Sequence, residues 1–446
     1  MKGLKLRYAA ALLGSILIFS ASGCSFAELG LDDALRPPKA TGDEAEIEQL
    51  IASSAKGAYT LKYPKSGNYR SAIIMKDLDG DETNEAVAFF RGKDEVTGVH
   101  MLVMNEVEGE WKISGDFVTE TTDVDCVEFA DLCDGDELEI LVGYTTYTPN
   151  IGFLSCYSYS DSGTSAIQST HNYSAFYCGD LDSSGKNEVI TLTLYNADNE
   201  AKATMLEYNE SKRELYAKSS AAMDPSVVKF RHAVFSKLSD GSKGIAVDGS
   251  YASEEICTQI IYFNKELAVL RNPLYKEKEK NPTLRTCEIF SDDISGSGEV
   301  EIPLAEKLPH SGVDMLKTVA DKLTLCSFDP KTESLIAKNS YAANYDYKFK
   351  FKLPDLWEDG SFTATNNENS MVFYEWKKKT LASELFEIRV FDVADWEQGK
   401  GIDEYTLIYR DNRYAYTFKN NTDENSRLSM TDDEIKTAFS VISDLS

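Results

Sequence analysis

Short apolar segments alternate with acidic turns along most of this chain. Between residues 57 and 343, apolar runs such as SAIIMK and EAVAFF are separated by clusters of Asp, Gly, Ser and Asn. Runs of about four to eight residues that are rich in β-branched and aromatic side chains, and are bounded by turn formers, predict strands. The pattern therefore predicts a mainly β protein.

The acidic turns themselves repeat along the sequence. Five similar loops read DLDGDETNEAV, DLCDGDELEIL, DLDSSGKNEVI, KLSDGSKGIAV and DISGSGEVEIP, and they start at Asp77, Asp131, Asp180, Lys237 and Asp293. An apolar run lies on each side of every loop, and two more strands fit before the next copy. Four strands in a unit of about 50–57 residues are typical of a β-propeller blade. We expect a β-propeller over residues 45–343, which begins with a short helix over 45–54, and the number of blades stays open.

The pattern changes near residue 344. Residues 345–353 alternate apolar and polar side chains, which predicts a half-buried strand, and further strands are expected over 371–376, 385–393, 405–410 and 414–419. Residues 431–445 carry one apolar stripe at helical spacing, and Thr431 and Glu434 have the spacing of a capping box. We therefore expect a small α+β domain over 344–446, in which a curved antiparallel sheet packs against a C-terminal helix.

The loops resemble those of a known family. The form D-x-D-x-D-x-x-x-[DE] between two blade strands is similar to the FG-GAP or VCBS repeats of integrin-alpha-like propellers, clearly at Asp77 and Asp180, less at Asp293, and in degenerate form at Asp131 and Lys237. The resemblance implies loops that bind Ca²⁺ on a non-enzymatic recognition scaffold. The C-terminal region, with an aromatic strand followed by L-P-x-x-W, loosely resembles the PsbP-like domains of bacterial lipoproteins.

Oxygen-bearing side chains occupy alternate positions of the better loops, as a Ca²⁺ site requires. Carboxylates this close together would repel one another without a counter-ion. The loop at Asp180 offers fewer carboxylates than the loop at Asp77, and the loop at Asp293 fewer again, so weaker binding is expected there. The expected ligands of structural Ca²⁺ are Asp77, Asp79, Asp81, Glu85, Asp180, Asp182, Ser184, Glu188, Asp293, Ser295, Ser297 and Glu301.

Other interpretations of the loops stay open. They are also compatible with plain Asp/Gly turns in which the last Glu accepts hydrogen bonds from loop amides. The second loop would bind a cation only through a shifted alignment that uses Asp134 and Asp136, and the fourth loop should bind none. An EF-hand is disfavoured, because the closing Glu stands at the ninth position and a strand follows.

The N-terminus predicts export and lipid anchoring. Lys2, Lys5 and Arg7 precede an apolar stretch that is too short to span a bilayer, and Ala-Ser-Gly-Cys24 follows it. This arrangement resembles the lipobox of bacterial lipoproteins, which implies a signal peptide over 1–23, cleavage before Cys24 and acylation of that residue. Residues 24–44 are expected to form a disordered tether. The protein is therefore expected outside the cytoplasm, held to the bacterial cell membrane by its lipid. Ordinary secretory cleavage near the same point is the alternative.

Composition and the remaining motifs narrow the function. A formal charge of −28 repels nucleic acid, so no such partner is expected. The seven other Cys residues are expected to be reduced and mostly buried, and one or two disulfides are the alternative that export would permit. No nucleophile-elbow, zinc-protease or P-loop motif occurs, and the four His residues are scattered. An aromatic platform for sugar is conceivable in the C-terminal domain, although a core role is favoured for its members, Trp357, Tyr374, Trp376 and Trp396.

Together these features predict a monomeric lipoprotein that acts as a non-catalytic binding, adhesion or envelope-scaffold protein. Its ligand would be a cell-wall component, a glycan or another envelope protein. The alternative is an exported carbohydrate-active hydrolase or lyase built on a propeller, for which the sequence names no catalytic residue.

Overall fold

The computed structural model describes residues 42–93, 95, 98–133, 135, 137–160, 162–316, 318–399, 404–421 and 426–442. The expected signal peptide, Cys24 and the tether up to residue 41 lie outside these residues. Strands dominate the described part, which contains four short helices. The expectation of a mainly β protein is therefore confirmed. None of the described helices is long and apolar enough to cross a membrane.

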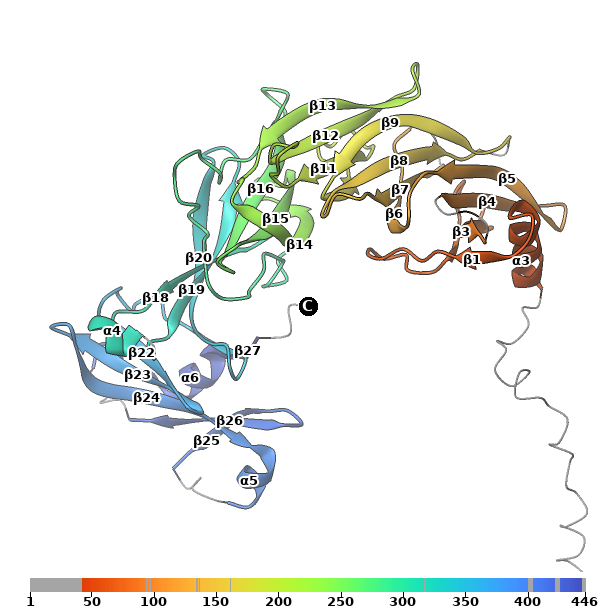
Figure 1. Cartoon of the computed structure of the whole chain (residues 1–446). Coiled ribbons are helices and arrows are strands. Elements are labelled where there is room, and N and C mark those ends of the chain that lie inside the picture. Colours follow the sequence, from red (N-terminus) through yellow and green to blue (C-terminus); the bar gives the residue numbers. More distant parts are fainter. Residues whose placement is uncertain are drawn as a thin grey trace, which may run out of the picture.

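Five antiparallel sheets follow one another along the chain in an open arc (Figure 1). The first three sheets each contain a four-stranded meander, and β1 adds to the first. The second and third sheets are joined by one parallel pair between β9 and β13. The strands of these sheets are β1 (Tyr59–Leu61), β2 (Ile73–Lys76), β3 (Glu85–Gly92), β4 (Val99–Val107), β5 (Glu110–Thr119), β6 (Val124–Ala130), β7 (Glu139–Thr145), β8 (Gly152–Ser158), β9 (Ser165–Tyr173), β10 (Ala175–Gly179), β11 (Glu188–Thr193), β12 (Lys202–Asn209) and β13 (Glu214–Ala222).

The fourth and fifth sheets continue the repeat. In the fifth, the first blade strand is reduced to a single bridge between Asp292 and Glu301. Each expected loop thus marks one blade-like sheet, as the four-strand spacing predicted. The strands of these two sheets are β14 (Val227–Lys237), β15 (Lys243–Tyr251), β16 (Ile256–Asn264), β17 (Val269–Arg271), β18 (Ile302–Lys307), β19 (Asp321–Asp329), β20 (Ser334–Asn344), β21 (Phe349–Lys352) and β27 (Phe439–Val441), and the short helix α4 (Gly312–Leu316) follows β18.

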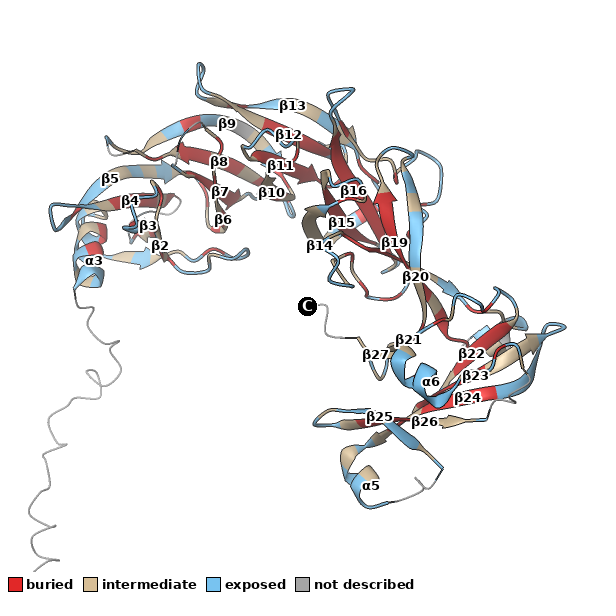
Figure 2. Cartoon of the chain, turned by 180° about the vertical axis from the view of Figure 1, so that it is seen from behind, coloured by how far each residue is buried: buried red, intermediate tan, exposed pale blue. Residues whose placement is uncertain are grey.

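In the first three sheets, the second strand of the meander is the most buried element. All residues of β7 except the last, and all residues of β11, are buried, and Figure 2 shows the same in red for the middle strands of the arc. These strands are covered on both faces by the neighbouring sheets. This explains why their sequences are continuously apolar rather than alternating.

Apolar cores fill the spaces between neighbouring sheets. One core joins residues of the first and second sheets, such as Phe89 and Tyr144, and similar cores join the second to the third, the third to the fourth and the fourth to the fifth. At the start of the arc, helix α3 (Asp43–Ser54) buries Ile47 and Ile51 against the outer face of the first sheet. The helix expected here is confirmed, and it covers a face that would otherwise expose apolar side chains.

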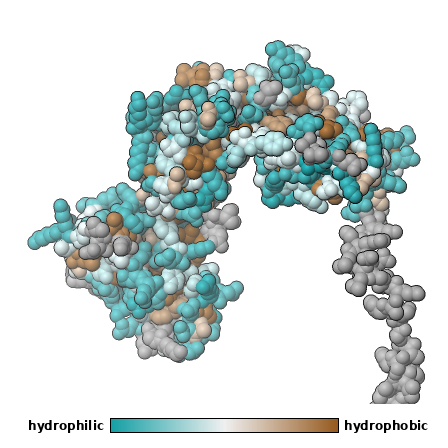
Figure 3. All heavy atoms as spheres, in the orientation of Figure 1, coloured by the Kyte–Doolittle hydropathy of each residue, from teal (hydrophilic) through white to brown (hydrophobic). Residues whose placement is uncertain are grey.

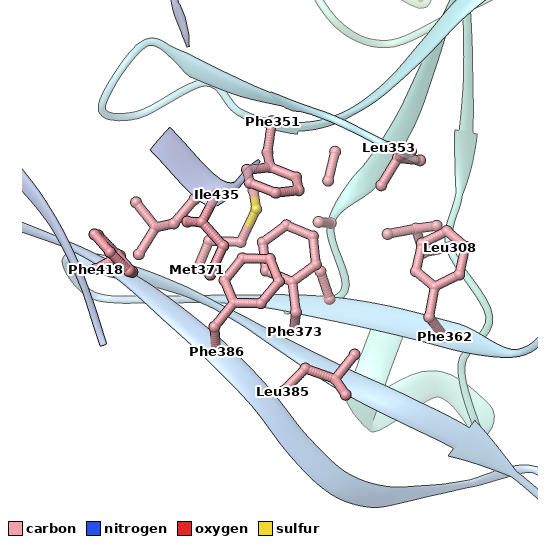
Figure 4. Close-up of a cluster of buried hydrophobic side chains, with 14 of the residues drawn as sticks. Leu308, Phe351, Leu353, Phe362, Met371, Phe373, Leu385, Phe386, Phe418 and Ile435 are labelled. Carbon is pink, nitrogen blue, oxygen red and sulfur yellow. The ribbon is translucent and has the colours of Figure 1, made fainter. Parts of the chain in front are cut away.

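The C-terminal domain covers the other end of the arc. Its five-stranded sheet shares a core with Ala342, Phe349 and Phe351 of the fifth sheet, and Figure 4 shows Phe351, Phe373 and Phe386 meeting in this core. Polar residues cover most of the visible face of the whole molecule (Figure 3). The elements of this domain are β22 (Phe362–Asn367), β23 (Ser370–Lys377), β24 (Thr380–Asp392), β25 (Thr406–Arg410), β26 (Tyr414–Asn420), α5 (Val393–Glu397) and α6 (Asp432–Ala438).

Two expectations for this region were wrong in extent. Residues 345–348 form a turn, since the Asn344 side chain accepts a hydrogen bond from Tyr347 N (3.0 Å), and the strand starts only at Phe349. The capping box of Thr431 and Glu434 is present. However, α6 ends at Ala438, because the following residues pair with β21 as strand β27. Pairing with the open edge of β21 is thus favoured over continuation of the helix. Leu445, the last residue of the expected apolar stripe, lies outside the described residues.

Candidate metal site

Every predicted loop connects the first two strands, or strand remnants, of one sheet. The loops at Asp77, Asp131, Asp180 and Lys237 join β2 to β3, β6 to β7, β10 to β11 and β14 to β15. The loop at Asp293 lies between the bridge residue Asp292 and β18. The self-similarity in the sequence therefore corresponds to one structural position, which occurs five times.

A buried Leu and a buried Glu define the frame of three of these loops. Glu85 Oε2 accepts a hydrogen bond from Leu78 N (2.8 Å), and Glu139 and Glu188 accept equivalent bonds from Leu132 N (2.9 Å) and Leu181 N (2.8 Å). The three Glu side chains are almost fully buried. The ninth-position Glu thus supports the turn even in the second loop, where Cys133 and Gly135 stand at the third and fifth positions. The second-position Leu was not predicted as part of this frame, although its recurrence in four of the loops was a signal that could have identified it.

The loops are also linked to one another across the sheets. Leu138 N donates to Leu78 O (2.7 Å), Asn187 N to Asp131 O (2.8 Å), and Val300 N to Lys237 O (3.1 Å). In each case an amide at the eighth position bonds to a carbonyl at the start of the preceding loop. At the remaining junction, Lys243 Nζ lies 3.2 Å from Asp180 Oδ2. The five loops form a continuous row in which each loop is fastened to the next.

The first loop brings three of its four expected carboxylates together. One oxygen from each of Asp77, Asp79 and Glu85 lies within 4.8 Å of the other two. Asp77 also accepts hydrogen bonds from Gly80 N (2.7 Å) and Glu82 N (3.1 Å), so the turn is formed around it. Asp81 is not in the converging group, and its Oδ1 accepts from Thr83 N (2.6 Å). The carboxylates therefore shape the turn and leave a compact set of oxygens suited to a hard cation.

Burial perturbs the central carboxylate of this group. Burial, together with the nearby charges of Asp79 and Asp81, raises the pKa of Glu85 to about 7, although the bond from Leu78 N opposes the shift. Glu188 in the third loop shows the same effect, and burial raises its pKa to about 7. A bound divalent cation would favour the ionised form of either side chain.

Lysine side chains reach the third loop. Asp180, Asp182 and Glu188 converge as in the first loop. However, Lys218 Nζ lies 2.8 Å from Asp182 Oδ2, and Lys243 Nζ contacts Asp180. After the opposing effect of burial, the hydrogen bond from Lys218 leaves the pKa of Asp182 below its ordinary value. Two ammonium groups thus supply part of the positive charge that the first loop would take from a cation.

The other three loops offer fewer ligands. In the second loop, the Cys133 thiol donates to Glu139 Oε1 (3.0 Å), while Asp134 and Asp136 lie outside the described residues. The fourth loop has no acidic residue at the alternate positions. In the fifth loop, Asp293 accepts hydrogen bonds from Ser297 N (2.7 Å) and Gly298 N (2.8 Å). Ser295 and Ser297 belong to the same turn, and no three-carboxylate group forms there among the described residues.

The surroundings of the other candidate residues indicate structural roles. Trp357 is buried against Phe362, Phe373 and Phe386, so it belongs to the core rather than to a sugar platform. All seven Cys residues of the described part are free thiols. His100 lies between Asp116 (3.0 Å) and Glu95 (3.1 Å), an arrangement that the sequence could not indicate because the partners come from different segments.

Comparison with known proteins adds little to this description. No protein-family model and no curated protein sequence matches the chain. Among solved structures, a Lactobacillus plantarum protein is similar at a TM-score of 0.28 and 10% identity, over 72% of this chain and 85% of that chain. Saccharomyces cerevisiae Sqt1 is similar at a TM-score of 0.33 and 9% identity, over 73% and 76% of the two chains.

Proposed function

We propose that this protein is a lipid-anchored extracytoplasmic binding scaffold in which Ca²⁺ braces the row of loops. The lipobox-like sequence at Cys24 supports the anchor, and the acidic repeats, which resemble FG-GAP or VCBS loops, support the metal. Its ligand would be a cell-wall component, a glycan or an envelope protein, bound by a monomer.

The observation that carries the metal proposal is the convergence of Asp77, Asp79 and Glu85 in the first loop of the row. Three carboxylates in this space favour a cation, and oxygen ligands favour Ca²⁺ over a metal that prefers nitrogen or sulfur. A cation here would hold Leu78, whose carbonyl accepts the bond from the second loop. Stiffening of the first loop would therefore also act on the junction with the second sheet.

The third loop is proposed as a weaker site. Asp180, Asp182, Ser184 and Glu188 supply the oxygens, and Lys218 and Lys243 compete with a cation for them. The fifth loop, with Asp293 and Glu301 as its carboxylates, would be weaker still.

Calorimetric titration of EDTA-treated protein with Ca²⁺ tests the metal. We expect one tighter site, and saturation by Ca²⁺ should raise the melting temperature. If Ca²⁺ produces no heat of binding and leaves the melting curve unchanged, the metal proposal fails and every loop is a plain turn.

Membrane fractionation of cells that produce the full chain tests the anchor. We expect the wild type in the membrane fraction and Cys24→Ala outside it. A Cys24→Ala protein that still fractionates with membranes would contradict lipid anchoring. A pull-down from envelope extract, with and without Ca²⁺, then tests whether the braced scaffold retains a defined ligand.

A further inference from the structure

A cavity lies between the third and fourth sheets, away from the acidic loops. Its volume is about 470 Å³, within the range of small-molecule sites. It is lined by the start of β10 and by the middle of β14, and both strands lie on the concave side of the arc (Figure 2). The polar residues that line it are Asn150, Ser174, Tyr177, Lys229, Arg231 and His232.

The lining of this cavity differs in charge from the rest of the protein. The chain carries 74 acidic and 46 basic residues, yet none of the described residues that line the cavity is Asp or Glu, and three can carry positive charge. Lys229 is exposed and makes no ion pair with a described residue. Arg231 pairs with Glu288 (2.8 Å) and Glu254 (3.8 Å), whose side chains are 70% and 84% exposed. Such solvated partners contribute little and can be exchanged for a ligand.

Two bulges lie in the part of β14 that lines the cavity. The pairing of β14 with β15 shifts between Val227 and Lys229 and again between Phe230 and His232. A regular strand sends successive side chains to opposite faces, whereas a bulge changes their direction. All five consecutive residues from Lys229 to Ala233 contribute to the lining of the cavity.

His232 gives a second sign that this cavity accommodates a ligand. Its Nε2 is buried and has no hydrogen-bond partner among the described residues. Its ring lies beside Phe290, with the centroids 5.6 Å apart. A buried polar atom without a partner costs free energy, and rotation of the ring toward an oxygen of a bound molecule would remove that cost.

We propose that this cavity binds the anionic group, a carboxylate or a phosphate, of an acidic sugar. Lys229 and Arg231 would contact the anionic oxygens, and His232 Nε2 would bond to a further oxygen. Asn150 and Ser174 provide neutral partners for hydroxyl groups, and Tyr177 and Phe230 provide apolar surface for a ring. The proposal rests on the proposed role as an extracytoplasmic binding scaffold, and it adds the chemical class of the ligand.

Calorimetry on the full chain with glucuronic acid, glucose 6-phosphate and glucose tests the proposal. We expect both acidic sugars to bind, with affinity that falls as salt is added, and glucose to bind at least roughly tenfold more weakly. The stronger of the two acids identifies the anionic group. Failure of both acids to bind, or equal binding of glucose, would overturn the proposal.

Variants connect the binding to the cavity. Lys229→Gln combined with Arg231→Gln should weaken the acidic sugars by roughly tenfold or more, because charged hydrogen bonds are lost. Lys112→Gln, at an exposed lysine on β5, should leave the affinity unchanged. Equal affinity in wild type and the double variant would refute this site.

Melting curves with and without Ca²⁺ on the same proteins separate this inference from the metal proposal. A Ca²⁺-dependent melting temperature in the double variant shows that its arc is folded. If the wild type responds to Ca²⁺ but binds no acidic sugar, only the cavity proposal fails. If it binds acidic sugar but ignores Ca²⁺, only the metal proposal fails.

Discussion

Replacement of Asp79 by Asn tests the electrostatics of the first loop, because it should have opposite effects on stability without metal and on the stabilisation by Ca²⁺. Asn has nearly the shape of Asp and keeps an oxygen that can accept the bond from Asp81 N (3.3 Å), but it removes one negative charge from the group with Asp77 and Glu85. Without metal, the variant should be more stable than the wild type, because repulsion is relieved. With Ca²⁺, it should gain far less than the wild type.

The separation of the carboxylate oxygens sets the magnitude. The oxygens of the group lie within 4.8 Å of one another, and at that limit two ionised oxygens repel by about 3.5 kcal/mol at an effective dielectric constant of about 20. Asp77 and Asp79 are partly exposed, so solvent and salt reduce this to on the order of 1 kcal/mol for each pair. Asp79 takes part in two pairs, and the pair with Glu85 is fully charged only above pH 7 because the pKa of Glu85 is about 7. Asp79→Asn should therefore stabilise the metal-free protein by about 1–2 kcal/mol at a pH above 7, and by less at lower pH. Ca²⁺ at about 100 times its dissociation constant should stabilise the wild type by about 2.7 kcal/mol.

Thermal melting in EDTA and in excess Ca²⁺ measures both effects. A gain of this size corresponds to several degrees in the melting temperature, at about 2–4 °C for each kcal/mol. Asp81→Asn is the matched control, because Asp81 belongs to the same loop but lies outside the converging group, and it should keep most of the Ca²⁺ response. A full Ca²⁺ response in Asp79→Asn, or its loss in Asp81→Asn alone, would refute the assignment of the ligands.

Three further predictions concern other parts of the arc. Lys218→Gln removes the ammonium group beside Asp182, so it should strengthen Ca²⁺ binding in the third loop by roughly tenfold, and calorimetry would detect a second site; no added site would show that the lysine does not compete. Arg285→Met leaves the fully buried Asp248 without its partner and should cost about 3–5 kcal/mol in urea unfolding, whereas a cost below about 1 kcal/mol would contradict a fixed buried pair. Burial alone would lower the pKa of His100, but its hydrogen bonds to Asp116 and Glu95 raise it overall. Its contribution to stability is therefore complete below about pH 6.5 and is lost as the pH rises through the higher folded pKa. The stability gap between wild type and His100→Gln should narrow as the pH rises above about 6.5, and a constant gap would exclude this titration.

The sequence was sufficient to predict the repeated unit. Loop, strand and spacing all depend on residues close together in the chain, so the positions of the loops at Asp77 and Asp180 could be read directly. The apolar stripe after Thr431 was also a local pattern, but it predicted a helix that continues beyond Ala438, where the structure has strand β27. Whether the residues after Ala438 continue a helix depends on the free edge of β21, which a local pattern does not contain.

The charge balance of the loops could not be predicted in the same way. Asp180 and Asp182 look like a weaker copy of the first loop until the fold brings Lys243 and Lys218 to them. The cavity beside β14 could also be recognised only from the structure. Two bulges interrupt β14 there, and the sequence around Arg231 contains no Gly or Pro that would predict them.

The order of the sheets in the arc has a consequence for how the protein loses its structure. Strand contacts between the described sheets join neighbours along the chain, as between β6 and β10, β9 and β11, or β13 and β17. Such an array has approximately one-dimensional cooperativity, in which each unit has its own stability and each junction a coupling energy. A destabilising substitution at one junction would then split the melting transition into two steps, rather than lower the melting temperature of a single transition. Helix α3 and the C-terminal domain close the two ends, so they set how easily unfolding begins, and a ligand held between two sheets would strengthen the coupling at that junction alone.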